Sequence, residues 1–147
     1  MKTLISVAIL FLTANAFATS PEDAKANIAK IDATEDACLK NEENQSTAGM
    51  RYCLGASYEE LDTLLNRVYK EMVAELKVKT NDEYQAEYNK EALARLQKSQ
   101  RAWIQFRGAN ADLSGMDSYG GSLEGIEILQ TFNKMTRERI VELTEVF

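Results

Sequence analysis

The sequence predicts an all-α fold, a small antiparallel helical bundle of about four helices with one disulfide. Apolar residues recur at steps of three and four over long stretches, which is the period of one face of an α-helix. The 147 residues contain one proline, and five of the seven glycines fall between Gly108 and Gly125. No segment has the strict alternation of apolar and polar residues that is typical of a β-strand.

Residues 1–18 have the pattern of a cleavable signal peptide. Lys2 gives a positive start, residues 4–12 are apolar, and small residues in A-x-A order lead to Ala18. We expect cleavage after Ala18 and a single domain over residues 19–147. An N-terminal membrane anchor is the alternative, but the apolar run is short for a bilayer-spanning helix. Because no cysteine stands at the expected cut, no lipid attachment is predicted, and the protein should be periplasmic or secreted.

The first two helices are indicated by a cap and by an apolar stripe. Ser20 caps a helix that starts at Pro21, with acidic residues in its first turn, and that runs to about Asn41. A second helix should run from Met50 to near Lys79, because apolar residues recur there at helical steps. This stripe consists of Leu54, Tyr58, Leu61, Leu65, Val68, Met72 and Leu76.

The second half of the chain predicts two more helices around a glycine-rich loop. Thr80 and Glu83 fit a capping box for a third helix, which we expect to close at Gly108. The glycines that follow predict the main loop, and Ser122 is the expected cap of a last helix. The third helix carries Tyr84, Tyr88, Ala92, Leu96, Trp103 and Phe106, and the last carries Leu129, Phe132, Ile140 and Leu143.

Composition argues against several classes of function. The chain has 17 Lys and Arg against 23 Asp and Glu, a net charge of −6, and loss of Lys2 with the signal peptide takes it to −7. Nucleic acids and anionic membranes both reward a basic surface, so neither is an expected partner. The absence of histidine excludes Ser/His and Cys/His nucleophile pairs and histidine metal sites. Acids such as Glu59, Glu60 and Asp62 lie on charged helix faces, so we expect no enzyme, cofactor or metal.

Export favours a disulfide between the two cysteines, Cys38 and Cys53. Closing a loop of about 15 residues contributes roughly 3 kcal/mol to stability through lost entropy of the unfolded chain. Two free thiols are the alternative.

Polar residues follow one side of the second and third helices at helical spacing. Trp103 and Arg107 are placed to stack as a cation–π pair, and Asp62 is a candidate partner for an arginine. We interpret the set as a hydrogen-bonded lattice that clamps two helices, with a ligand site as the alternative. The lattice consists of Tyr58, Asp62, Asn66, Tyr69, Gln100, Trp103 and Arg107.

The order and spacing of several short motifs resemble the N-terminal domain of the LprI-type lysozyme inhibitors. The motifs are Thr47-x-x-Met50-x-x-Cys53, Tyr58-x-x-x-Asp62-x-x-Leu65-Asn66-x-x-Tyr69, Leu96, Gln100-x-x-Trp103-x-x-x-Arg107, Gly120-Gly121-Ser122 and Thr136-x-x-Arg139. The resemblance covers roughly Cys38 to Leu143. It implies a small, exported, helical, disulfide-stapled bacterial domain, in a family that is named for inhibition of lysozyme.

The chain departs from this family in its cysteines. Members commonly carry two more, which would fall near Ala111 and Thr131, and both are absent here. Their joint absence is what a disulfide partnership predicts, and it supports pairing of Cys38 with Cys53. It also implies a looser segment from Gly108 to Thr131.

An acidic exported protein fits a basic lysozyme as its partner, because opposite net charges speed encounter. We expect the loop from Gly108 to Ser122 to form the binding edge through Asp112, Met116, Asp117 and Tyr119. The alternative is an ordinary solvated loop without a binding role. The competing function is a periplasmic interaction, envelope-stress or toxin-immunity module with another protein partner.

Overall fold

The computed structural model describes residues 19–146 and confirms the all-α fold class. Four α-helices, α1 (Pro21–Lys40), α2 (Thr47–Leu76), α3 (Glu83–Ser114) and α4 (Glu124–Thr144), are joined by short connections. Two of these connections contain a 3-10 helix, η1 (Glu42–Asn44) and η2 (Gly115–Ser118). The expected signal peptide lies outside the described residues. Within residues 19–146, no helix is long and apolar enough to cross a membrane.

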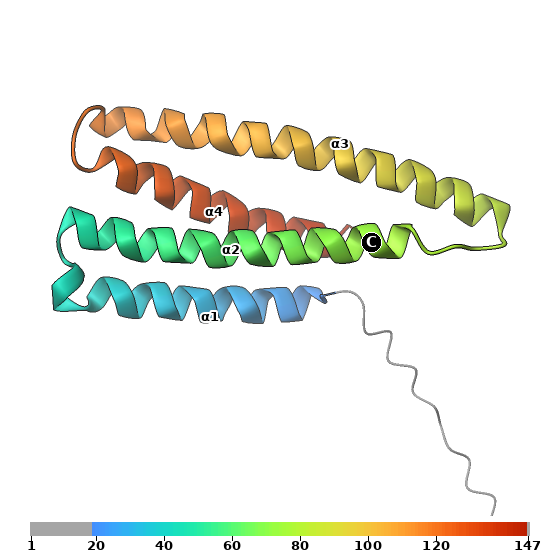
Figure 1. Cartoon of the computed structure of the whole chain (residues 1–147), viewed down its shortest axis with the longest axis horizontal. Coiled ribbons are helices and arrows are strands. Elements are labelled where there is room, and N and C mark those ends of the chain that lie inside the picture. Colours follow the sequence, from blue (N-terminus) through green and yellow to red (C-terminus); the bar gives the residue numbers. More distant parts are fainter. Residues whose placement is uncertain (1–18, 147) are drawn as a thin grey trace, which may run out of the picture.

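Helices α2 and α4 form the centre of the bundle. Consecutive helices run in opposite directions, so α2 and α4 run the same way, and these two share the most extensive interface (Figure 1). Helix α1 packs against both on one side, and α3 packs mainly against α4 on the other. No contact joins α1 to α3 in the described part of the chain.

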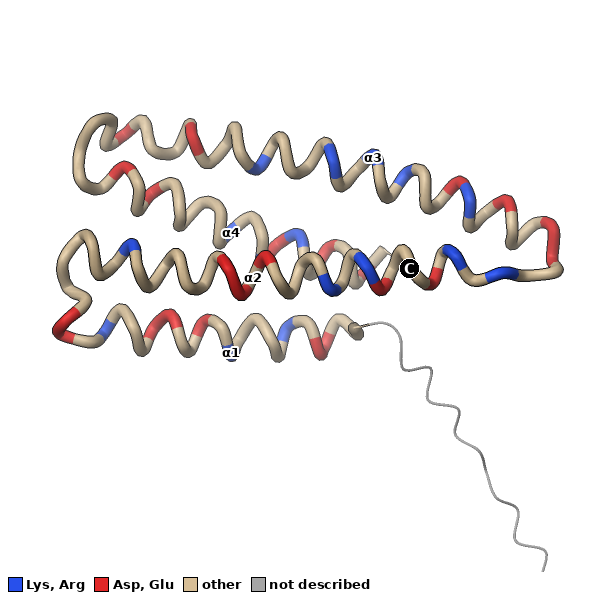
Figure 2. The backbone as a smooth tube through the Cα atoms, viewed as in Figure 1, with Lys and Arg blue, Asp and Glu red and all other residues tan. Residues whose placement is uncertain are grey.

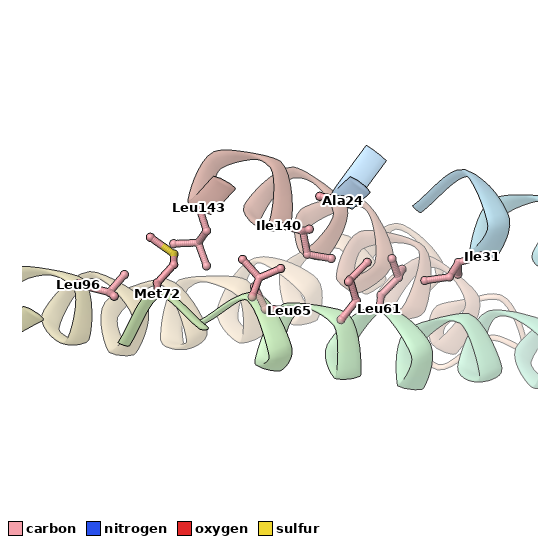
Figure 3. Close-up of a cluster of buried hydrophobic side chains, with 10 residues drawn as sticks. Ala24, Ile31, Leu61, Leu65, Met72, Leu96, Ile140 and Leu143 are labelled. Carbon is pink, nitrogen blue, oxygen red and sulfur yellow. The ribbon is translucent and has the colours of Figure 1, made fainter. Parts of the chain in front are cut away.

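The hydrophobic core follows the stripe predicted for the second helix. Helix α2 supplies half of the ten clustered side chains, because three- and four-residue steps keep them on one face (Figure 3). The cluster consists of Ala24, Ile31, Leu61, Leu64, Leu65, Val68, Met72, Leu96, Ile140 and Leu143. Full burial of one such leucine or isoleucine contributes about 1.5–3 kcal/mol.

Helix α3 is only partly attached to this core. Leu96 is its single member of the cluster, and no residue from Glu83 to Arg95 is buried. Figure 1 shows the first turns of α3 reaching past the C-terminal end of α4. The start of α3 therefore projects from the bundle with most of its surface open to solvent.

The predicted end of the third helix at Gly108 is wrong. Helix α3 continues through Gly108 to Ser114, and the connection to α4 is correspondingly shorter than the expected loop. A glycine inside a helix costs about 1 kcal/mol relative to alanine, which packing outweighs. Here Ala111 is fully buried one turn later, so the extra turns gain contacts that local propensity does not reveal.

Two predicted caps are also wrong. Helix α3 begins at Glu83 because Asp82, not Thr80, accepts a hydrogen bond from the backbone N–H of Gln85. Thr80 instead accepts from the backbone N–H of Asp82. Helix α4 begins at Glu124 without a side-chain cap, so Ser122 does not have the expected role. In contrast, Ser20 caps α1 as predicted and accepts from the N–H of Asp23.

Candidate protein-binding surface

A disulfide fixes the end of the bundle where α1 turns into α2. Cys38 and Cys53 are bonded, with their Cα atoms 5.7 Å apart, which confirms the expected pairing. The side-chain amide of Asn44 donates to the backbone carbonyl of Cys38 at 3.0 Å. A Cβ atom on Gly49 would lie 2.5 Å from the Cα atom of Asn44, so the backbones approach closely here. The α1–α2 connection is therefore held tightly.

The α3–α4 connection lies at the same end of the bundle and is ordered by its own hydrogen bonds (Figure 1). Ser118 Oγ donates to Glu127 Oε1 at 2.6 Å, and Ser114 Oγ, which donates to the carbonyl of Ala111 at 2.7 Å, also lies 3.3 Å from the backbone carbonyl of Glu127. The backbone N–H of Gly120 donates to Glu124 Oε2 at 2.9 Å. Gly120 has a φ of 72°, a conformation that favours glycine. These bonds tie η2 and the following turn to α4.

The four residues predicted for the binding edge are all exposed on this connection. Asp112 lies in the last turns of α3, Met116 and Asp117 lie on η2, and Tyr119 follows, with 75% of its surface exposed. Leu113 and Leu123 are also exposed here, and the sequence did not single them out because an apolar residue in an assumed loop carries no periodic signal. We call the set Asp112, Leu113, Met116, Asp117, Tyr119 and Leu123 the α3–α4 edge.

The α3–α4 edge sits in a segment of one charge sign. Residues 108–133 contain no Lys or Arg, but they contain Asp112, Asp117, Glu124 and Glu127. Figure 2 shows acidic positions alone along this turn. Large exposed apolar side chains beside acids are typical of a surface that binds a basic partner.

Arg107 is the centre of the predicted polar lattice. Its Nη1 atom donates to Asp62 Oδ1 of α2 and to Thr136 Oγ1 of α4, both at 3.0 Å. The guanidinium lies 4.8 Å from the ring centroid of Trp103 and 5.7 Å from that of Tyr58. Asn66 donates to the other carboxylate oxygen of Asp62 at 2.9 Å. One buried arginine thus contacts three helices.

A second arginine connects Gln100 to α4. Arg139 donates through Nε to Gln100 Oε1 at 3.1 Å and through Nη2 to Ser99 Oγ at 2.7 Å. Its guanidinium lies 5.8 Å from the Trp103 ring centroid. Tyr69, in contrast, packs partly buried against the hydrophobic cluster. Most of the lattice residues lie at the α2–α3–α4 interface.

The predicted lattice did not include its residues on α4. Thr136 and Arg139 are in a sequence motif at one-turn spacing, which places them on one helix face. That spacing does not say which helix the face meets. Phe132 completes the set, with its ring 5.3 Å from that of Tyr58 in an edge-to-face arrangement.

A separate ionic cluster joins α1 to α4. Arg137 donates to Asp32 Oδ1 at 2.6 Å and to Glu35 Oε2 at 2.9 Å. Burial of the guanidinium lowers the pKa of Arg137, but its hydrogen bonds and attraction to Glu35 and Asp32 more than offset this and raise the pKa above its ordinary value. Asn133, which is 1% exposed, donates to the carbonyl of Leu54 at 3.0 Å. Within residues 19–146, no three His, Cys, Asp or Glu side chains gather as metal ligands.

Comparison with known proteins places the chain in a family. Residues 38–143 match the family described as "Lysozyme inhibitor LprI". An uncharacterized protein, R02472, from Rhizobium meliloti (strain 1021) is 32% identical over 103 residues, which are 69% of this chain and 73% of the relative. No solved structure matches. With the family match spanning most of the bundle, the chain belongs to the LprI lysozyme inhibitor family.

Proposed function

We propose that the protein is an exported inhibitor that binds a basic lysozyme through the α3–α4 edge. The observation that carries the proposal is the run of residues 108–133, which has four carboxylates, no basic residue and several exposed apolar side chains. Membership of a family named for lysozyme inhibition supports a protein partner of this kind. The signal-peptide pattern of residues 1–18 supports export to the compartment where lysozyme meets the cell wall.

Charge gives the edge its means of attracting such a partner. Common animal lysozymes are strongly basic, and the exported chain has a net charge of −7 once Lys2 is removed. Long-range attraction raises the encounter rate, whereas exposed aromatic and aliphatic side chains supply contact area after docking. Tyr119 and Leu113 are the most exposed candidates for that contact, followed by Met116.

Inhibition then requires only that the bound protein obstruct a polymeric substrate. The hydrogen bonds that tie Ser118 and Gly120 to α4 hold the edge in one conformation before binding. Little conformational entropy is lost on association when the binding surface is already ordered. No covalent chemistry by the inhibitor is needed.

A clearing assay on bacterial cell walls tests the proposal. We expect the purified protein to slow clearing by a basic lysozyme at low salt, and to do so less well at high salt, because salt screens the attraction. The protein alone should not clear the walls, since clearing would identify a hydrolase instead. Undiminished lysozyme activity at low salt, with the inhibitor folded and in excess, would refute the proposal.

A further inference from the structure

Helix α3 carries a second stripe of exposed side chains, which are apolar toward the two ends of the stripe and polar in its middle. Its members are separated by steps of four, three, four, four, three and four, and every one is exposed. These steps place them on one helix face, about a third of a turn from the buried face that contains Leu96 and Arg107. We call this set the α3 stripe; it consists of Tyr84, Tyr88, Glu91, Arg95, Ser99, Ala102 and Phe106.

The α3 stripe borders a groove. Tyr88, Arg95 and Ser99 line one wall of a groove of about 460 Å³, and Leu143 of α4 and Val146, which follows α4, line the other. Tyr84 is 81% exposed and Phe106 is 59% exposed. A helix laid along α3 in this groove would cover the stripe and also touch the end of α4.

Charge is segregated along α3. Residues 82–91 contain four acids and a single lysine, whereas residues 92–111 contain four basic residues and no acid. The colours in Figure 2 separate in the same way along this helix. Of the four basic residues, Arg107 is buried and already paired with Asp62. Arg95, Lys98 and Arg101 are exposed.

We propose that the α3 stripe pairs with the α3 stripe of a second copy of this chain, in antiparallel orientation. Antiparallel pairing lays the acidic start of each helix over the basic middle of the other, while parallel pairing would oppose like charges. The steps of the stripe read the same in both directions about Arg95, so Tyr84 meets Phe106 of the second copy, and Tyr88 meets its Ala102.

The symmetry of this pairing defines its polar contacts. A two-fold axis at Arg95 brings the Arg95 side chains of the two copies together, and each is flanked by its own Glu91 and by the Glu91 of the second copy, which offset the like charges. Within one chain, Arg95 Nε already lies 3.3 Å from Glu91 Oε2. Glu87 faces Arg101 of the second copy, and the symmetry makes this ion pair twice. The α3–α4 edges lie at opposite ends of the dimer and remain free.

Sedimentation equilibrium of the purified protein tests the pairing. We expect a monomer–dimer equilibrium that Phe106→Glu weakens by about tenfold or more, since it places a charge in an apolar contact. Ile104→Glu is the matched control, because Ile104 is also an exposed apolar residue of α3 but lies off the stripe. Glu87→Arg and Arg101→Glu should each weaken the dimer, and the double variant should restore it.

Cross-linking tests the register independently. Arg95→Cys should form a disulfide-linked dimer under mild oxidation, because the two-fold axis passes beside this residue. Lys90→Cys, exposed on another face of α3, should not. A protein that stays monomeric at high concentration overturns the proposal, and so do equal effects of the Phe106 and Ile104 changes or equal cross-linking of the two cysteine variants. None of these measurements involves lysozyme, so failure here leaves the proposed function standing.

Discussion

Arg107 Nη1 lies 3.0 Å from Asp62 Oδ1 and joins α3 to α2, two helices that otherwise contact each other little. The same nitrogen donates to Thr136 of α4. The Arg107 side chain is 9% exposed and that of Asp62 is 34% exposed, so the pair is screened by solvent on one side only. This ion pair connects α3 to α2, whereas Arg139 connects α3 to α4.

Replacing Arg107 by alanine should therefore destabilise the bundle. Removal of the guanidinium takes away the donor to Asp62 Oδ1 and to Thr136 Oγ1 and empties the space against Trp103, so we expect a loss of about 2 kcal/mol in the free energy of unfolding. Urea denaturation followed by circular dichroism measures this. Lys90→Ala, which removes only an exposed pair with Glu87, should change the same quantity little. Equal losses for both variants would count against the lattice.

Two glycines of the α3–α4 region should respond to alanine in opposite directions. A Cβ atom on Gly108 meets nothing within 4 Å, so Gly108→Ala should stabilise α3 by about 1 kcal/mol. On Gly115 the same atom would lie 2.9 Å from Ile128 Cγ1, so Gly115→Ala should destabilise the protein by about 1 kcal/mol or more. Thermal unfolding of the two variants compares them directly. A loss of stability in Gly108→Ala would argue against helix through that residue.

The disulfide should stabilise the folded protein by lowering the conformational entropy of the unfolded chain. Cys38 and Cys53 are separated by 15 residues, and closing such a loop contributes about 3 kcal/mol. We expect the double variant Cys38→Ser, Cys53→Ser to lose about this much free energy of unfolding. A reductant should destabilise the native protein to a similar extent and leave the double variant unchanged. Identical stability of the native protein with and without reductant would contradict the prediction.

Replacing Arg137 by methionine should weaken the contact between α1 and α4. It removes two hydrogen bonds and leaves Glu35, with 16% of its side chain exposed, next to Asn133. We expect a loss of about 1–2 kcal/mol, against almost none for Lys40→Met, which removes an exposed pair with Asp36. Chemical denaturation of both variants gives the comparison.

The pH dependence of the Arg137 contribution has a definite sign. Folding raises the pKa of Arg137, so its protonated form is favoured in the folded state. Its contribution is fully present below the ordinary pKa of arginine and is lost only as the pH rises through the higher folded-state pKa. Titration of this arginine should therefore not affect stability between neutral and moderately alkaline pH. A loss there that is absent in Arg137→Met would contradict this.

Sequence periodicity predicted the helices best where many apolar residues share a face. The α2 stripe has seven residues at six helical steps, and five residues of the core cluster lie on that helix, whose C-terminal end is three residues earlier than predicted. The ends of the helices were harder to predict, because Thr80 and Asp82 are both good N-cap residues and a single glycine such as Gly108 disfavours a helix only weakly. Burial of Ala111 explains why α3 continues past Gly108, and no local sequence pattern predicts that burial.

The sequence predicted the lattice residues of α2 and α3 but not their partners on α4. Spacing put Asp62 and Arg107 on polar helix faces, and the structure brings them together. The partners on α4, Thr136 and Phe132, depend on α2 and α4 packing in parallel at the centre of the bundle. The lengths of the connections do not predict that arrangement. Short connections lead one to expect that helices consecutive in the chain are the main neighbours in the bundle.

Titration of a basic lysozyme with the native protein and two variants is the most direct test of how this protein works. Asp112→Ala, Asp117→Ala, Tyr119→Ala removes the acids and the ring of the α3–α4 edge, and Glu59→Ala, Glu60→Ala removes the same negative charge from the exposed face of α2. We predict that native protein and the α2 variant inhibit cell-wall clearing at low salt, and that the edge variant, with unchanged helical circular dichroism, does not. Full inhibition by the edge variant would contradict the proposed binding surface, and no inhibition by the native protein would contradict lysozyme as the partner.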